Sequence, residues 1–356
     1  MTPSSVFAAP LVRWCALLLA ALLAGQALGL IDVPASLLLG PLAVGAAAGL
    51  RGARLRVGAL PHQLAQGVAG VMIGHYMTAE IAGVIGGLWP VVLLFAAMTL
   101  GAAFAVGRGV GRWTGLGVET SVWGFLPGMA GAVIALAHER GLDSRLVAFM
   151  QITRLVTVIL VMIGVAGVLA AGAEAAAKTG AQDPGGVLLA LGIAALGPAA
   201  ARLLPFLPGP ASLAPLAITA GLQAGGVAEA APPGWLLAGA YLVLGLQVGL
   251  RFTPDLVRHA LRAAPAVIGG SLALIGLCAL SGAALSVAAG TDLLTGMLST
   301  VPGSVETIAL IAIHSGADVS FVMTMQIARM FAVVLIGPTM ARALAREKGP
   351  SRAPAE

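Results

Sequence analysis

Two stretches of this sequence place a glutamine and an arginine inside an apolar run. They are "PGMAGAVIALAHERGLDSRLVAFMQITR" from Pro127 to Arg154 and "PGSVETIALIAIHSGADVSFVMTMQIAR" from Pro302 to Arg329. In each stretch the glutamine precedes the arginine by three residues, so both side chains share one face of a helix. An arginine at the centre of a membrane helix costs about 2.5–3.5 kcal/mol, and its planar guanidinium group suits a carboxylate or a phosphate. The repetition of so costly a residue indicates a defined structural or binding role.

A Pro-Gly pair opens each stretch. Proline removes a main-chain donor and glycine admits unusual backbone angles, so we expect the apolar segments to break at Pro127–Gly128 and at Pro302–Gly303. A helix that restarts after such a break presents free N–H groups and the positive end of its dipole, which favour anions. Two breaks and two arginines together predict a cavity for an anion.

The predicted substrate-binding set takes in both motifs. Its members are Pro127, Gly128, Gln151, Arg154, Pro302, Gly303, Gln326 and Arg329. The sequence leaves three roles open for the arginines: contact with a solute, hydrogen bonds to the carbonyl groups of the broken helix, or ion pairs with Glu119 or Glu306. For the two glutamines, hydrogen bonds between helices are the alternative to ligand binding.

Acidic residues near the motifs suggest further roles. Glu306 breaks the symmetry of the copies, since it aligns with Gly131. A carboxylate beside the second break predicts a coupling site for a proton or another cation, and its alternative role is to neutralise Arg329. Asp143 and Asp318 follow a glycine turn in their copies and open the next helix, so we expect them to be N-caps.

The composition places these residues in a membrane protein. Of the 356 residues, 59% are hydrophobic and 9% are charged, whereas soluble domains carry about a quarter charged residues. The mean hydropathy is +1.01. Apolar stretches of about 20 residues recur along the chain, and strand-like alternation is weak, so the pattern predicts an all-α polytopic protein rather than a barrel. The net charge of +5 comes from short basic loops, so we expect no direct contact with nucleic acid.

No motif in the sequence indicates catalysis or a metal. Cys15 and Cys278 lie in apolar runs, and their surroundings lack the spacing of zinc ligands. The sequence also has no serine-hydrolase elbow, zinc-protease motif or P-loop. We therefore expect neither an enzyme nor a bound metal or cofactor.

The chain divides into two similar halves. We expect apolar segments at 11–30, 36–50, 63–80, 81–107, 118–138 and 144–172, and at 186–204, 211–227, 233–251, 264–290, 291–314 and 319–344. Membrane repeats at 1–172 and 186–346 then flank a polar linker at 173–185, and a cytoplasmic tail follows at 347–356. The Pro-Gly, Gly-x-Asp and Met-Gln-x-x-Arg residues recur at one separation of 175 residues, which indicates a duplication. The run after Arg13 also fits a signal peptide, but the apolar segment that follows at once favours a retained first helix.

The basic loops predict the orientation of these segments. With the N-terminus inside, the distribution of arginine and lysine fits ten crossings, two re-entrant hairpins at 118–138 and 291–314, and both termini inside. Each half then crosses five times, so the halves are inverted, as in many secondary transporters. If both hairpins crossed fully instead, Arg202 and the group Arg251–Arg262 would fall outside.

The repeated block resembles the membrane AbrB-type duplication family of bacteria. Its copies read "FLPGMAGAVIALAHERGLDSRLVAFMQITRLVTVIL" and "TVPGSVETIALIAIHSGADVSFVMTMQIARMFAVVLIGP", and the similarity covers nearly the whole chain. The family's Pro-Gly-Gly-x-x-Glu/Ser stretch reads PGMAG and PGSVE here. Family members are labelled ammonia monooxygenase, which would need grouped metal ligands, or regulator of gene expression. The resemblance implies an integral protein of the bacterial inner membrane, a transporter with a reported regulatory link.

Charge, repeats and resemblance together predict a secondary transporter of a small anionic solute. The expected partners are that solute and the lipid bilayer, and a homodimer is compatible with the sequence. The alternative is a membrane-embedded sensor or regulator that affects gene expression without a DNA-binding domain of its own. A membrane oxidoreductase is the third and weakest alternative.

Overall fold

A computed structural model describes residues 4–31, 33–77, 80–127, 133–134, 137–138, 140–169, 184–207 and 209–332. This part of the chain is helical, with no strands among its residues, so the predicted all-α class is confirmed. The helices are α1 (Ser4–Gly29), α2 (Ser36–Leu50), α3 (Ala59–His75), α4 (Glu80–Thr114), α5 (Val118–Phe125), α7 (Ser144–Leu169), α8 (Pro184–Ala195), α9 (Gly197–Leu203), α10 (Pro210–Ala224), α11 (Gly234–Gly249), α12 (Pro254–Ala260), α13 (Ala264–Ala289), α14 (Leu293–Thr300) and α15 (Val305–Ser315). A further helix covers Val319–Ala332.

Several helices are long and apolar enough to cross a bilayer, which makes the chain a multi-pass membrane protein. Among the described residues there are five such spans: Leu11–Gly29, Trp89–Thr114, Ser144–Leu169, Pro184–Leu203 and Ala264–Ala289. Helices α11 and α12, which meet at a bend of 50°, make a sixth if they form one span. The predicted ten crossings exceed this count because α2, α3 and α10 have only 15–17 residues, whereas a full crossing takes about 20. The last predicted segment, 319–344, lies within the described residues only over Val319–Ala332.

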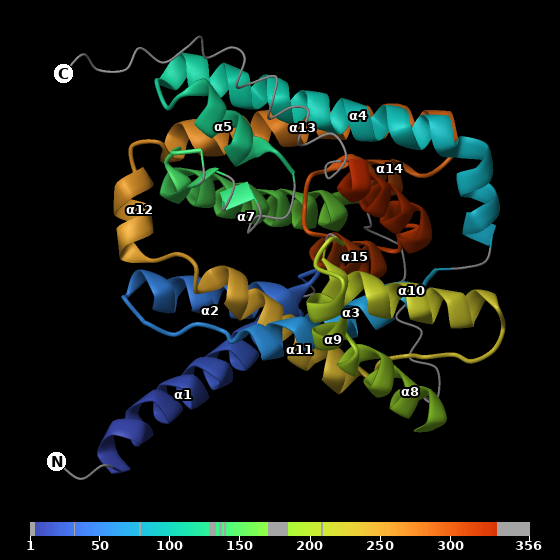
Figure 1. Ribbon diagram of the computed structural model, residues 1–356, viewed down its shortest axis with the longest axis horizontal. Helices are drawn as coiled ribbons and strands as arrows, with labels where there is room; N and C mark the ends of the chain where they lie inside the picture. Colours follow the sequence, from blue (N-terminus) through green and yellow to red (C-terminus); the bar gives the residue numbers. More distant parts are fainter. Residues whose placement is uncertain are drawn as a thin grey trace.

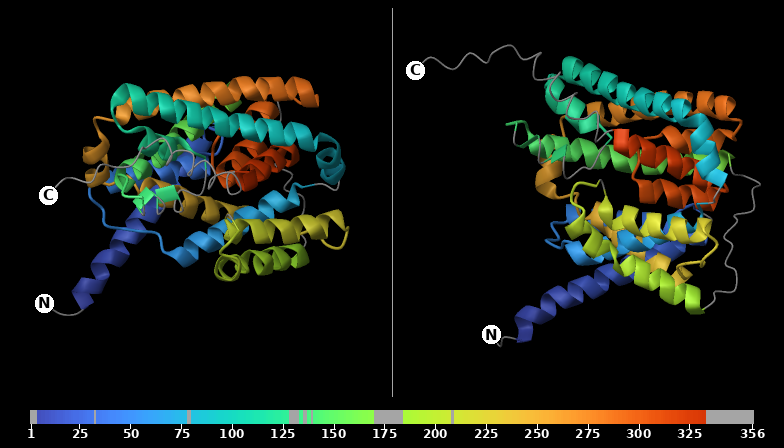
Figure 2. Two further views of the ribbon diagram at one scale, coloured as in Figure 1. Left: turned by 45° about the horizontal axis from the view of Figure 1, so that its top comes forward. Right: turned by 45° about the vertical axis from the view of Figure 1, so that its right-hand side comes forward.

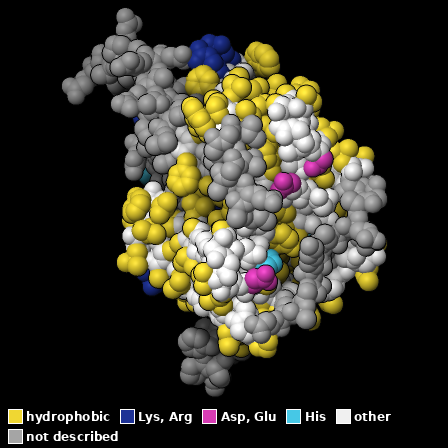
Figure 3. All heavy atoms as spheres, turned by 90° about the vertical axis from the view of Figure 1, so that its right-hand side faces the viewer, with side chains coloured by type: hydrophobic (Ala, Val, Ile, Leu, Met, Phe, Trp, Pro, Cys, Tyr) yellow, Lys and Arg dark blue, Asp and Glu magenta, His cyan; other side chains and the backbone are white. Residues whose placement is uncertain are grey.

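The surface of the long helices suits lipid. Trp89 and Trp113 lie near the two ends of the span in α4 and are 59% and 90% exposed. They are separated by roughly 36 Å of helix at about 1.5 Å per residue, which matches the distance between the two interfaces of a bilayer where tryptophan concentrates. Leu280 and Val287 of α13 are also exposed. Figure 3 shows one face of the molecule on which hydrophobic side chains spread widely and charged ones are few.

The helices form two layers, which Figures 1 and 2 show one above the other. We call the first the arginine layer; it contains α4, α5, α7, α13, α14, α15 and the helix Val319–Ala332. The second, the glycine layer, contains α1, α2, α3 and α8–α11. Contacts are dense inside each layer, and α15 packs against α3 where the layers meet. The short helix α12 lies on the path from α11 to α13, between the two layers (Figure 1).

Glycines hold the second layer together by letting backbones touch. Helix α3 packs on α10, and α11 packs on α2. A Cβ atom on Gly74 would lie 2.6 Å from the carbonyl oxygen of Leu216, and one on Gly245 would lie 2.5 Å from that of Leu38. Both distances are far inside van der Waals contact, so only glycine permits this approach, as in other small-residue helix interfaces.

The two halves give equivalent elements at the separation that the motifs predict. Helices α3 and α11 begin at Ala59 and Gly234, and α5 and α14 begin at Val118 and Leu293, each pair 175 residues apart. The spans in α4 and α13 end at equivalent residues too, and these two helices pack together and run in opposite directions in Figure 1. The α3–α10 contact also mirrors the α11–α2 contact. These equivalences support the duplication.

Some predicted boundaries were wrong. The segment expected at 63–80 begins at Ala59 and ends at His75, because Pro61 fits within the first turn of a helix, where its missing N–H is not needed. Helix α4 extends through Thr114 rather than ending near 107. The predicted linker at 173–185 and tail at 347–356 lie mostly outside the described residues, and the division into repeats stays a prediction.

Candidate site at the two broken helices

Helices α5 and α14 both end inside the protein, two residues before a proline. Leu126 follows α5 with φ −62° and ψ 121°, and Val301 follows α14 with φ −66° and ψ 135°. Proline disfavours the helical conformation in the residue before it, so Pro127 and Pro302 account for these extended residues. Both prolines are buried. The predicted breaks are therefore present, and each leaves the last carbonyl groups of a helix without helical partners.

The two glutamines of the repeated motif bind those carbonyl groups. Each donates from Nε2 to two carbonyl oxygens of the helix that ends: Gln151 to Trp123 (2.9 Å) and Leu126 (3.0 Å), and Gln326 to Leu298 (2.6 Å) and Val301 (3.1 Å). The acceptors occupy equivalent positions in the two halves. Both glutamines are almost fully buried. Of the two roles that the sequence left open for them, the structure shows hydrogen bonding between helices.

The two arginines complete the same arrangement. Arg154 donates to the carbonyl oxygen of Phe125 at 2.8 Å and to Oε1 of Gln151 at 3.1 Å. Arg329 donates to the carbonyl oxygens of Val301 at 2.7 Å and Gly303 at 3.2 Å. A positive charge at a helix C-terminus also favours the helix dipole. The arginines therefore cap the broken helices, which was one of the three predicted roles.

Ion pairs with Glu119 or Glu306, the third role left open for these arginines, do not form among the described residues. Glu119 pairs with Arg140 at 3.3 Å, and Glu306 accepts a hydrogen bond from Gln66. Within the described residues, neither Arg154 nor Arg329 pairs with a carboxylate, because the nearest acceptors are main-chain oxygens and one amide oxygen.

The two caps leave polar groups unused. Arg154 and Arg329 are each only 5% exposed, and their Nε atoms have no hydrogen-bond partner. The Oε1 atom of Gln326 is also buried without a partner. Helix α7, which carries Arg154, packs against α14 and α15, and a Cβ atom on Gly303 would lie 3.4 Å from Cγ1 of Val158, one turn after Arg154. The two motifs, one from each half of the chain, thus keep buried polar groups that no hydrogen bond satisfies.

Comparison with known proteins places this arrangement in a family. Residues 37–345 match the family described as "Transition state regulatory protein AbrB". The chain belongs to the membrane AbrB family. It is 34% identical to the Escherichia coli (strain K12) protein named "Putative regulator AbrB" over 337 residues, which cover 94% of this chain and 97% of that one. It is 26% identical to the Bacillus subtilis (strain 168) "Uncharacterized protein YhjN" over 299 residues, 79% of this chain and 78% of the relative. No solved structure matches the chain.

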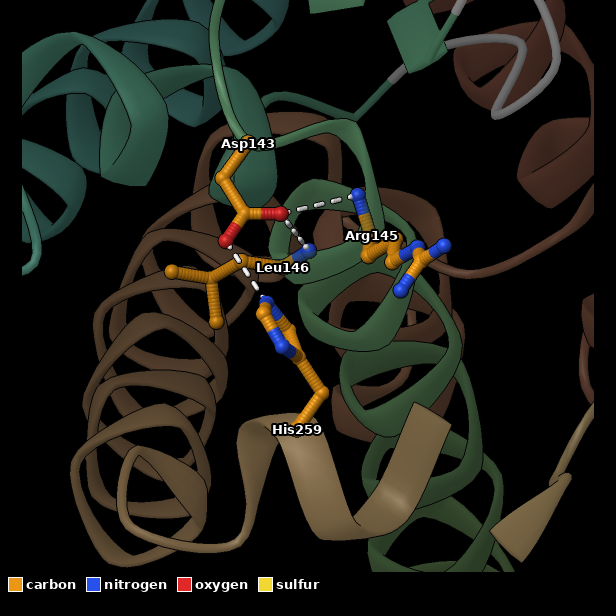
Figure 4. Close-up of polar contacts among 4 residues, drawn as sticks. All are labelled: Asp143, Arg145, Leu146 and His259. Atoms are coloured by element: carbon orange, nitrogen blue, oxygen red, sulfur yellow. Dashed lines mark hydrogen bonds and ion pairs between the residues drawn. The ribbon is translucent and has the colours of Figure 1, made fainter. Parts of the chain in front are cut away.

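The two predicted N-caps of this AbrB family chain are confirmed. Oδ1 of Asp143 accepts from the N–H groups of Arg145 and Leu146, and Oδ1 of Asp318 accepts from that of Phe321. Only the first aspartate has a histidine partner: His259 of α12 approaches its Oδ2 at 2.8 Å, and Figure 4 shows the carboxylate between this ring and the start of α7. Partial burial disfavours the charged form of Asp143, but the hydrogen bonds from the ring and the main chain hold its pKa below the usual range.

Sequence reasoning missed two residues near Glu306. Gln66 of α3 donates from Nε2 to Oε1 of Glu306 at 3.4 Å, across the boundary between the layers. His62 lies one turn earlier on the same face of α3, and its Nδ1 is buried without a partner. A histidine and a glutamine four residues apart on one face of a mostly apolar helix were the available signal.

Part of the predicted site lies outside the described residues. Gly128 and the residues that follow it to 132 are among these, so only the second copy shows how the chain restarts after its break. There the hydroxyl of Ser304 accepts from the N–H of Thr307 at 3.2 Å and caps α15. In the described part of the chain, no three histidine, cysteine or acidic side chains gather as metal ligands would.

Proposed function

We propose that this AbrB family protein is a secondary transporter that carries a small anionic solute across the bacterial inner membrane without changing it chemically. The observation that carries the proposal is the pair of buried arginines at the two breaks. Each retains an unpartnered Nε–H, and neither has an acidic partner among the described residues. Two uncompensated positive charges in one buried region favour an anion as their missing partner.

The architecture supports transport. The breaks fall at equivalent positions of two duplicated halves, and the equivalent helices α4 and α13 run in opposite directions. Inverted halves with interrupted helices are the usual framework of secondary transporters, where substrate sites form near the midplane. We infer ten crossings, with α5 and α14 as the first arms of two re-entrant hairpins and both termini on the cytoplasmic side. The hairpin arms have 8 residues each, too few to cross.

A second candidate function is solute sensing. The relative from Escherichia coli is named "Putative regulator AbrB", and the family description contains the word "regulatory". A sensor would bind the solute between the same arginines but would not move it. Binding alone therefore does not distinguish the two functions, and the experiment needs a transport measurement.

Thermal unfolding of the purified protein with a panel of anions identifies the solute class. The panel contains inorganic phosphate, sulfate, acetate, succinate and citrate. An anion that binds only the folded protein stabilises it by about 2.7 kcal/mol at a concentration of 100 times its Kd. The stabilising anion, radiolabelled, is then offered to proteoliposomes that contain the same anion inside.

Transport predicts counterflow of the labelled anion, and Arg329→Lys is expected to lower it at least tenfold. Lysine keeps the positive charge. It lacks the planar guanidinium group, which can bind the carbonyl oxygen of Val301 and still present a free N–H donor to the anion. Arg258→Lys, on α12 away from the breaks, is the matched control and should leave counterflow unchanged. Binding without counterflow would support the sensor instead, and counterflow that survives Arg329→Lys at full rate would place the site elsewhere.

A further inference from the structure

Glu306 belongs to the arginine layer and accepts a hydrogen bond from the other layer. It lies in the first turn of α15, the helix that packs against α3. Its side chain is half-buried and accepts a hydrogen bond from Gln66 at the long distance of 3.4 Å. A carboxylate in such a place is costly unless it is paired, and this one has a single neutral donor across the boundary.

His62 supplies a second titratable group at the same place. It precedes Gln66 by one turn of α3, so the two side chains share a face. Its Nδ1 is buried and makes no hydrogen bond. Helix α11, which packs against α3, ends just before Arg251 and carries Tyr241, whose hydroxyl donates to the sulfur of Met72.

We propose that Glu306, Gln66 and His62 form a proton-binding site at the boundary between the two layers, and that its occupancy couples proton movement to solute transport. The coupling part rests on the proposed transport function, whereas the proton site does not. The site holds one proton more in its loaded form: a carboxylate with a neutral imidazole carries one negative charge, and the added proton, on either group, makes the pair neutral. No other bond forms or breaks.

The surroundings explain why this proton would matter for movement. Beyond Gln66, the next eight residues of α3 are "GVAGVMIG", all without polar side chains. A displacement of α15 toward the C-terminal end of α3 would carry Glu306 over this apolar surface. An ionised carboxylate pays a large desolvation cost there, and a neutral site pays much less. Proton loading would therefore release the layers, and proton loss would fix them through the bond from Gln66.

Arg329 and Glu306 of the proposed proton site are linked through the same broken segment. Arg329 holds the carbonyl group of Gly303, and α15 with Glu306 begins two residues later. A shift of this broken segment would therefore change the surroundings of both Arg329 and Glu306. That short connection gives the coupling a physical route, since one rigid element with two positions is biased by both ligands.

Infrared difference spectroscopy of the full chain in liposomes tests the proton site directly. Spectra are compared between about pH 8 and about pH 5, which brackets the ordinary range of histidine and approaches that of glutamate. We expect a pH-dependent band, either the carbonyl stretch of a protonated carboxyl group or a ring mode of a protonated imidazole, that is lost or displaced in Glu306→Gln. His62→Gln should move the midpoint of the change. Glu229→Gln, in a loop outside the cluster, is the control and should retain the band.

The outcomes separate the proton site from transport. A band that persists unchanged in Glu306→Gln, or a change that follows sodium rather than pH, would overturn the proton site even if the protein transports an anion. If the band is lost, solute counterflow then tests the coupling: Glu306→Gln should retain counterflow but lose accumulation driven by a pH gradient. Retained accumulation would overturn the coupling. Glu306→Asp is the control for misfolding. It keeps the carboxyl group, so this variant should retain a band.

Discussion

Gln151 and Gln326 each turn one side-chain amide toward two main-chain carbonyl groups of a helix that stops inside the protein. In a bilayer these carbonyl groups have no water to bind, so the side chains replace the missing helical turn. The arginine three residues later adds donors to the same end and charge of the favourable sign. The repeated Gln-x-x-Arg is thus a helix C-cap supplied from a neighbouring helix.

Gln151→Leu and Gln326→Leu should each destabilise the protein. Leucine keeps the volume but leaves two buried carbonyl groups without their amide donor, which costs about 1–3 kcal/mol per unsatisfied group. Thermal unfolding in detergent should show a comparable decrease for both variants, since the acceptors are equivalent. Gln247→Leu is the control, because Gln247 of α11 is half-buried and its amide has no hydrogen bond. Equal stability of Gln326→Leu and the wild type would contradict the capping role.

The Asp143–His259 pair makes a separate, pH-dependent contribution. Since folding lowers the pKa of Asp143, its ionised form favours the folded state above about pH 4 and this benefit disappears as the pH falls through the lowered value. Asp143→Asn keeps an oxygen for the N-cap and removes the charge. We expect a loss of less than about 1 kcal/mol at pH near 6, because both side chains are 42% exposed.

The difference between wild type and Asp143→Asn should then shrink below about pH 4. Unfolding by denaturant at several pH values measures it. Asp318→Asn is a matched control: Asp318 caps an equivalent helix but has no ion pair among the described residues. A loss as large in the control as in Asp143→Asn would show that the cap, rather than His259, is responsible.

At the scale of elements, the helices of the glycine layer pack closely because glycines at their contacts carry no side chain. Gly74 and Gly245 admit a neighbouring backbone where any side chain would collide. Lipid and protein interiors are similarly apolar, so close contact of this kind, rather than burial from water, is what holds short membrane helices together.

Gly245→Ala should destabilise the α11–α2 contact. Its Cβ would lie 2.5 Å from the carbonyl oxygen of Leu38, and a backbone atom cannot move aside as a side chain can. Overpacking of this kind costs about 1–3 kcal/mol. Gly239→Ala in the same helix has open space around its Cβ and should be neutral or stabilising by up to about 1 kcal/mol. Similar unfolding temperatures for the two variants would refute the packing argument.

At the scale of the whole molecule, the inferred inversion assigns Arg145 and Asp318 to opposite sides of the membrane. Both are exposed at the starts of equivalent helices. In a Cys15→Ser background, where the remaining Cys278 is buried, an impermeant maleimide should label Asp318→Cys from outside intact cells and Arg145→Cys only after lysis. Labelling of both from the same side would exclude the inversion.

The sequence predicted what repeats and local chemistry control. The Pro-Gly breaks, the shared face of glutamine and arginine, and the aspartate caps follow from backbone rules that need no tertiary information. The choice between carbonyl groups, solute and carboxylates for Arg329 did not follow, because it depends on which broken helix lies within reach. The role of Gln66 was not predicted for the same reason, because its partner Glu306 is 240 residues away in the chain.

The exchange of partners between halves has a consequence during synthesis. Helix α3 packs on α10 and α2 on α11, so the first half enters the membrane with its glycine faces bare and their partners not yet translated. Gly70 packs against Ser212, which is translated about 140 residues later. At roughly 5–20 residues per second, the delay between the two residues is on the order of ten seconds. For that interval the glycine faces of the first half are open to lipid and to other small-residue helices.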